Sequence, residues 1–227
     1  MNKLEKLERR WNELSGKPKN KEEIEETLLL GKEIELERAK EYSLMIIELK
    51  EKGIAISSVW DLVNTNQSYP NAIPILIEHL PKDYHEKNKE GIVRALAVKD
   101  AIGKASPVLI AEYNRTSKDK TLLRWAIGNT IYTTITENDV DSILPIVQDK
   151  TNGMSRQMFV AALGKVKSEK TENVLIDLLD DEEVAPQALE ALGKMKSVKA
   201  KGRISVLSKH SNPLIRKEAE KALKKIT

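Results

Sequence analysis

The pattern of apolar positions along the chain predicts helices arranged in pairs. Aliphatic runs, such as residues 75–77 and 143–147, alternate with segments in which an alanine precedes leucine or isoleucine. Apolar residues recur at helical intervals, and no segment alternates apolar with polar residues over the length of a strand, so we expect no sheet. The alanine signature returns five times, as Ala95-Leu96, Ala126-Ile127-Gly128, Ala162-Leu163-Gly164-Lys165, Ala191-Leu192-Gly193-Lys194 and Ala222-Leu223-Lys224.

The alanines of this signature lie 29 to 36 residues apart, and self-similarity at such a period is typical of stacked helical repeats. We expect an all-α, right-handed α-α superhelix of about five helix pairs. In each pair the first helix holds the aliphatic run and the second holds the signature. Ser106-Pro107 and Asn212-Pro213 fit an N-cap followed by proline at the first helical position. The second helices are predicted to start near His85, Lys118, Met154, Glu182 and Pro213.

Aligning the five repeats with one another separates buried from exposed columns. The residues three before and one after the signature alanine are apolar in every repeat, so we assign them to the core. The residue one before the alanine varies freely, as an exposed column of a solenoid does. Partner specificity is expected there, with Arg94, Trp125 and Glu190 as predicted contacts. The whole column reads Arg94, Trp125, Ala161, Glu190 and Lys221.

Residues 1–52 differ from the rest and are predicted to form a helical N-terminal cap on a repeat array over residues 53–227. Two helices are expected, over residues 2–14 and 21–50, with Ser15-Gly16-Lys17-Pro18 between them. Asn20 and Glu23 fit a capping box at the second helix. Its broad apolar stripe must lie against another surface, and docking on the first repeats is favoured over a coiled-coil dimer. The stripe includes Ile24, Leu28, Leu29, Ile34, Leu36, Ala39, Met45, Ile46 and Leu49.

The final repeat carries the most specific resemblance. Asn212-Pro213, Arg216, Ala219 and Ala222-Leu223 follow the pattern of the HEAT-like repeat family, especially the short bacterial type related to phycobilisome-lyase repeats. The resemblance covers roughly residues 70–227. It implies a helical solenoid, and because the family includes scaffolds, adaptors, chromophore lyases and regulators, it does not imply one activity. The chain departs from the pattern with Lys224 in place of glycine and Ala185 in place of arginine.

The amino-acid composition argues against several classes of function. Hydrophobic residues make up 40% and charged residues 32% of the 227 residues, and the net charge is only +3. Dedicated nucleic-acid-binding proteins usually show a stronger or more focused basic excess. The chain has no cysteine, which excludes disulfides, thiolate metal sites and a cysteine nucleophile. The charged N-terminus lacks a signal-peptide core and no run is long enough to span a membrane, so we expect a cytoplasmic protein.

A basic column precedes the signature in four of the five repeats. It could follow a phosphate backbone, or it could be a structural ladder in which each cation binds carbonyls or a carboxylate of a neighbouring repeat. The ladder is favoured because arginine is usual at this position in the family that the chain resembles. The column reads Lys89, Lys120, Arg156, Ala185 and Arg216, of which Lys89, Lys120 and Arg156 are kept as candidate binding residues.

No motif predicts catalysis, a cofactor or a metal. His79, His85 and His210 lack ligand spacing, and neither a phosphate-binding loop nor a nucleophile elbow is present. We therefore expect a non-catalytic protein-binding adaptor or regulator, scaffold-like or inhibitor-like, that holds a protein partner in the concave surface formed by the second helices. The alternative is a nucleic-acid-binding HEAT-like protein, including a relative of the alkylated-base DNA glycosylases, for which Trp60-Asp61 is the only local pairing.

Overall fold

The computed structural model describes residues 2–226, so Met1 and Thr227, the outer bounds of the two predicted parts, lie outside the described residues. The described chain folds into α-helices and four short 3-10 helices, without a strand. None of these helices is long and apolar enough to cross a membrane. The α-helices are α1 (Lys3–Ser15), α2 (Lys21–Glu41), α3 (Ser43–Glu51), α4 (Val59–Val63), α5 (Ala72–His79), α6 (Glu86–Ala95), α7 (Ser106–Arg115), α8 (Thr121–Thr134), α9 (Val140–Gln148), α10 (Gln157–Leu163), α11 (Glu169–Asp177), α12 (Ala185–Met195), α13 (Lys201–Leu207) and α14 (Pro213–Leu223).

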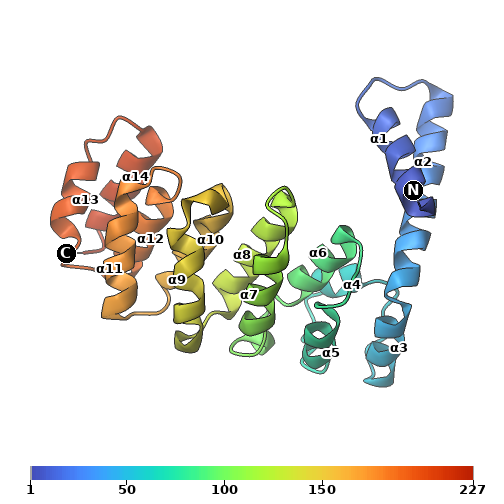
Figure 1. Cartoon of the computed structure of the whole chain (residues 1–227), viewed down its shortest axis with the longest axis horizontal. Coiled ribbons are helices and arrows are strands. Elements are labelled where there is room, and N and C mark those ends of the chain that lie inside the picture. The colour runs from blue at the N-terminus through green and yellow to red at the C-terminus, as the bar shows by residue number, and fades with distance from the viewer. Residues whose placement is uncertain (1, 227) are drawn as a thin grey trace.

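Five helix pairs run side by side from α5–α6 to α13–α14, with a hairpin of α1 and α2 standing at one end (Figure 1). This arrangement confirms the predicted helical solenoid. Each second helix packs against the second helix of the next repeat, in the order α6, α8, α10, α12 and α14. The first helices hardly touch one another. The closer spacing of the second helices makes their exposed side the inner, concave side of the array, which we call the inner face.

Glycine after the signature alanine allows this close spacing. A Cβ atom at Gly164 would lie 2.7 Å from both Cα and Cβ of Ala191 in the next second helix. A Cβ atom at Gly193 would lie 3.0 Å from Cα of Ala222. The equivalent residue after α14 is Lys224, which is exposed.

The two apolar columns form the core as predicted. All five residues three before the signature alanine are buried, as are four of the five residues one after it, and Leu223 is half-buried. The varied column is not uniformly exposed, because Ala161 is 98% buried. The expectation of a wholly exposed column was therefore wrong in the third repeat, where a small side chain lets α10 pack closely.

The N-terminal helices depart from the prediction in two ways. Residues 21–50 form two helices rather than one, because the chain bends at Tyr42 (φ −104°). Tyr42 is buried, with its hydroxyl 3.2 Å from Ser58 Oγ, and α3 turns to pack against α5. The predicted apolar stripe is divided at this bend. On α3, Met45 and Leu49 are buried in the core and Ile46 packs against it. On α2, Ile34 is buried, but four residues of the stripe stay exposed, namely Ile24, Leu28, Leu29 and Leu36.

Polar contacts hold the hairpin to the first repeat. The buried Asn88 of α6 donates through Nδ2 to Arg38 O (2.9 Å) and to Glu41 Oε2 (2.7 Å). The backbone N–H of His85 also donates to Glu41 Oε2 (2.8 Å), and its ring lies 3.2 Å from Glu8 Oε2. These bonds join α1, α2 and α6, so they fix the direction in which the hairpin points.

Helix starts agree with the sequence where a capping side chain is present. Asn20 caps α2 in a capping box with Glu23, and Asn212 caps α14 ahead of Pro213. Ser106 is not a cap as predicted but the first residue of α7, and its hydroxyl donates to Thr134 O (3.1 Å). Three second helices begin three residues later than predicted, because turns precede α8 and α12 and a 3-10 helix precedes α10.

Candidate binding surface

The hairpin and the inner face enclose a groove of about 590 Å³, which we call the hairpin groove. Its walls come from α1 and α2 on one side and from the starts of α6 and α8 on the other. Both apolar and charged side chains line it. The lining residues are Glu8, Trp11, Asn12, Gly31, Ile34, Glu35, Arg38, His85, Glu86, Lys87, Glu90, Lys120 and Leu122.

Three large apolar side chains are exposed at or beside this groove. Trp11 of α1 is 38% exposed and Leu122 of α8 is 66% exposed. Trp125 is 45% exposed and lies one helical turn after Leu122, on the same side of α8. Exposed tryptophans that sit beside a concave surface are typical anchors of protein interfaces.

The predicted contact Arg94 is held over the ring of Trp125. Its guanidinium carbon lies 5.8 Å from the ring centroid, and its Nε donates to Glu90 Oε1 (2.8 Å). Lys87 donates to the other oxygen of Glu90 (2.9 Å). Burial opposes ionisation of this carboxyl group, but the hydrogen bonds from Lys87 and Arg94 outweigh it and lower the pKa of Glu90. The pair Arg94–Trp125 is therefore positioned before any partner binds.

Glu190, the third predicted contact, lies in the C-terminal half of the inner face. It pairs with Lys194 (2.6 Å), which also donates to the hydroxyl of Tyr132 (2.7 Å). Burial disfavours the charged form of Lys194, yet the hydrogen bonds to Glu190 and Tyr132 raise its pKa. The ammonium groups of Lys165 and Lys194 lie 4.4 and 5.1 Å from the centroid of the Tyr132 ring. Glu190 and Trp125 are thus on the same face but in different clusters.

The basic column is largely the favoured structural ladder. Lys89 donates to Glu112 of the next repeat (3.0 Å), and both side chains are nearly buried. Arg156 has no exposed surface and binds Val147 O (3.1 Å) and Asp181 Oδ2 (2.9 Å). Its candidacy as a binding residue was wrong, because no partner can reach it.

Lys120 is the member of the column that stays half-exposed, and it pairs with Glu86 (2.8 Å). In the second repeat the buried cation is instead Arg124, which lies one helical turn after Lys120. Arg124 donates to Thr116 O (2.8 Å) and to Asn152 Oδ1 (2.7 Å). The column alignment missed Arg124, since the shift by one turn hides it among surrounding lysines.

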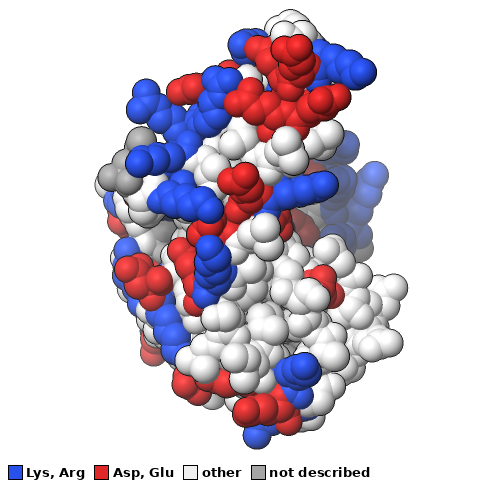
Figure 2. Space-filling model, turned by 90° about the vertical axis from the view of Figure 1, so that its right-hand side faces the viewer, with Lys and Arg blue, Asp and Glu red and all other residues white. Residues whose placement is uncertain are grey.

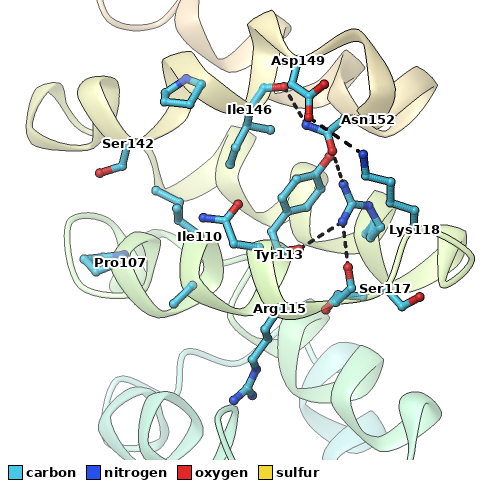
Figure 3. A pocket seen from close by; sticks show the side chains of 15 residues that line it. Pro107, Ile110, Tyr113, Arg115, Ser117, Lys118, Ser142, Ile146, Asp149 and Asn152 are labelled. Atoms are coloured by element: carbon cyan, nitrogen blue, oxygen red, sulfur yellow. Dashed lines mark hydrogen bonds and ion pairs between the residues drawn. The ribbon is translucent and has the colours of Figure 1, made fainter.

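A second cavity, of about 800 Å³, lies on the opposite side of the array between α7 and α9 (Figure 3). Arg124 and Tyr113 lie at its inner end, with the guanidinium carbon 3.9 Å from the ring centroid. The hydroxyl of Tyr113 is 2.6 Å from Ser155 Oγ, and Lys118 lies 3.9 Å from Asp149. These polar groups already satisfy one another, so the cavity offers no aligned set of free groups.

The remaining chemical candidates have structural roles. The carboxylate of Asp61 accepts from the backbone N–H groups of Ser57 (2.8 Å) and Ser58 (3.0 Å) and caps α4. Trp60 packs against the core with Lys87 over its ring at 4.8 Å. Residues 2–226 contain no group of histidine, aspartate and glutamate side chains that could hold a metal ion.

Charges of both signs mix over the hairpin. Viewed from the N-terminal end, lysine, arginine, aspartate and glutamate side chains crowd its surface, while the lower part of this view is largely uncharged (Figure 2). Residues 53–77 carry a single charged residue, Asp61. A surface with intermixed charges favours a protein partner over a polyanion.

A comparison with protein-family models supports the repeat assignment. The family model for HEAT repeats matches residues 140–224. An engineered protein, whose crystal structure was determined by the Northeast Structural Genomics Consortium, is similar at 16% sequence identity and a TM-score of 0.44, over 100% of this chain and 99% of that chain. No curated protein matches the chain.

Proposed function

Residues 140–224 are HEAT repeats in a helical solenoid, and from this premise we propose that the chain is a non-catalytic, protein-binding adaptor or regulator. HEAT-repeat solenoids are scaffolds that often mediate protein interactions. The partner lies on the inner face and reaches into the hairpin groove.

The observation that carries this proposal is that Trp11 and Leu122 line one groove, with Trp125 exposed one helical turn after Leu122. Trp11 comes from the hairpin, and the other two come from α8, more than one hundred residues later. The surrounding charges are paired: Arg94 and Lys87 bind Glu90, and Lys120 binds Glu86. An apolar centre with a satisfied polar rim is the usual anatomy of a protein interface.

The same pairing argues against nucleic acid at this site. Phosphate binding needs cations that are free to exchange counterions for phosphates. Three of the cations nearest the groove already bind carboxylates, and the face of Trp125 that a base would stack on carries Arg94. Arg156, a candidate for a row of phosphate-binding cations, is fully buried and cannot contact a phosphate.

The test compares two leucines with the same exposed fraction. Leu122 and Leu36 are both helical and both 66% exposed, but Leu36 lies on the outer side of α2 and does not line the groove. Cell lysate would first be treated with nuclease, and the proteins that the immobilised wild-type chain retains would be identified. The purified partner would then be titrated by calorimetry. Leu122→Ala should weaken binding by about tenfold, the loss of roughly 1.4 kcal/mol, and Leu36→Ala should leave it unchanged.

Two results would contradict the proposal. Equal affinity of the Leu122→Ala and wild-type chains would remove the groove from the interface. Retention of nucleic acid alone, with every protein lost on nuclease treatment, would replace the adaptor function with nucleic-acid binding.

A further inference from the structure

Two segments at one edge of the array repeat the same lysine-rich sequence. Residues 163–170 and 192–199 both read Leu-Gly-Lys-x-Lys-Ser-x-Lys, and they begin at the C-terminal ends of α10 and α12 and continue into the chain that follows. Because α10, α12 and α14 pack side by side, the segments at their C-terminal ends share one edge of the solenoid. We call this the lysine edge, formed by Lys165, Lys167, Lys194, Lys196, Lys199, Lys201 and Lys225.

The charge of this end of the array is far from that of the chain as a whole. Residues 191–226 contain eleven lysines and arginines against two glutamates, a net charge of +9. The whole chain carries +3, so its other residues together carry −6. Glu169 and Glu172, in the first turn of α11, lie at this edge, and Glu169 is 4.0 Å from Lys199. The other acidic residues of the fourth repeat lie at the opposite ends of α11 and α12, where Arg156 binds Asp181.

Four lysines of the edge are free. Lys167, Lys196, Lys201 and Lys225 are exposed, and their ammonium groups make no hydrogen bond or ion pair within the described chain. The other three have partners: Lys165 donates to Tyr132 O, Lys194 pairs with Glu190, and Lys199 donates to Asn173 Oδ1 (2.6 Å).

Three of the four free lysines stand at positions where lysine does not stabilise the fold. Lys196 has φ +57°, a left-handed conformation that favours glycine and strains a residue with a Cβ atom. Lys167 directly precedes Ser168, the N-cap of α11, and Lys201 opens α13. Cations are disfavoured at these positive helix ends. Three positions therefore hold lysine where the fold itself favours other residues.

We propose that the lysine edge binds an acidic, extended polypeptide segment of a partner protein. Neighbouring packed helices lie about 8–10 Å apart, and three residues of an extended chain span about 10 Å. Carboxylates at every third residue would therefore meet successive lysine clusters. Val198, 74% exposed between Lys196 and Lys199, adds an aliphatic contact for such a segment. This surface is separate from the hairpin groove, so the inference does not depend on the proposed function.

The chemistry of the edge favours a polypeptide over other polyanions. Residues 191–226 contain no phenylalanine, tyrosine or tryptophan on which a base could stack or that could anchor in a lipid interface. The nearby ring of Tyr132 already has the ammonium groups of Lys165 and Lys194 over it, at 4.4 and 5.1 Å from its centroid. All seven cations of the edge are lysines, whereas bidentate phosphate recognition uses arginine. Point-charge attraction by flexible lysines suits carboxylates that are spaced along a chain.

The test uses a fluorescent peptide with glutamate at every third residue, and the same peptide with glutamine instead. Binding to the full chain is followed by fluorescence anisotropy at several salt concentrations. The triple variant Lys167→Gln, Lys196→Gln, Lys201→Gln should bind the glutamate peptide about tenfold more weakly, the sum of three exposed ion pairs. The matched control Lys32→Gln, Lys50→Gln, Lys52→Gln removes the same charge from lysines that are equally free, and should bind like wild type.

A single variant tests whether a loss of binding is caused by unfolding. Lys196→Gly relieves the left-handed strain, so it should unfold at a higher temperature than wild type while binding the glutamate peptide more weakly. The proposal is overturned if the glutamate peptide binds no better than the glutamine peptide, or if both triple variants lose affinity equally. Tighter binding of a single-stranded oligonucleotide or of phosphatidylserine vesicles through the same lysines would also overturn it.

Discussion

A methyl group added at Gly164 should destabilise the array, although alanine is normally the better helix residue. The structure places this new Cβ atom 2.7 Å from two carbon atoms of Ala191, one of them in the backbone. Carbon atoms are in favourable contact at about 3.5–4.0 Å, so the overlap is close to 1 Å. Because a backbone atom cannot rotate away, α10 and α12 must move apart.

The expected change in the free energy of unfolding is the difference between two opposing effects. Gly164 is the C-cap of α10 and has φ −65°, which alanine also adopts, so the substitution by itself stabilises the fold by about 0.4–1 kcal/mol through the unfolded chain. Overpacking a closely packed site costs about 1–3 kcal/mol. We expect Gly164→Ala to lower the free energy of unfolding by about 1–2 kcal/mol. Gly202 of α13 is the control, because a Cβ atom there meets nothing within 4 Å. Gly202→Ala should be stabilising by about 0.5–1 kcal/mol.

Urea denaturation followed by far-ultraviolet circular dichroism would measure both variants, with each transition fitted separately if the repeats unfold in steps. Gly193→Ala, whose Cβ atom would lie 3.0 Å from the backbone of Ala222, should fall between the two. The reasoning is refuted if Gly164→Ala is as stable as Gly202→Ala, since the glycine would then have no part in the spacing of the inner helices.

Two further predictions concern buried charges. Arg156→Met should lower the free energy of unfolding, measured in urea titrations, by about 3–5 kcal/mol, because it leaves the 91%-buried Asp181 without its cation. If Arg156→Met lost no more stability than Lys120→Met at the exposed position, Arg156 would not be part of a structural ladder. The pKa of Glu90 is held below its ordinary value of 4.5, so its ionised form stabilises the fold above pH 4.5 and this stability is lost as the pH falls through the lowered pKa. Stability measured over this acid range should depend less on pH in Glu90→Gln, and an unchanged dependence would show that Lys87 and Arg94 do not stabilise the carboxylate.

Much of the fold could be read from local patterns. The signature alanines, the two apolar columns and the caps at Asn20 and Asn212 depend on residues within one or two helical turns, so the sequence displays them directly. The candidate site was harder to predict. Arg94, Trp125 and Glu190 lie on the second helices α6, α8 and α12, and their role as contacts stays a prediction. Arg156 was taken as a surface candidate because a basic column looks the same whether its cations are buried or exposed.

An all-helical array of five pairs follows from the amino-acid pattern, since the repeat period and the apolar spacing are properties of neighbouring residues. The folded chain was needed to show that the helix bends at Tyr42, that the apolar stripe of α2 stays largely exposed, and that Trp11 and Leu122 line one groove. These features depend on how far the hairpin is turned by the hydrogen bonds of Asn88 and His85. Contacts between residues 44 or more positions apart leave no periodic signal along the chain, so no local pattern could have revealed them.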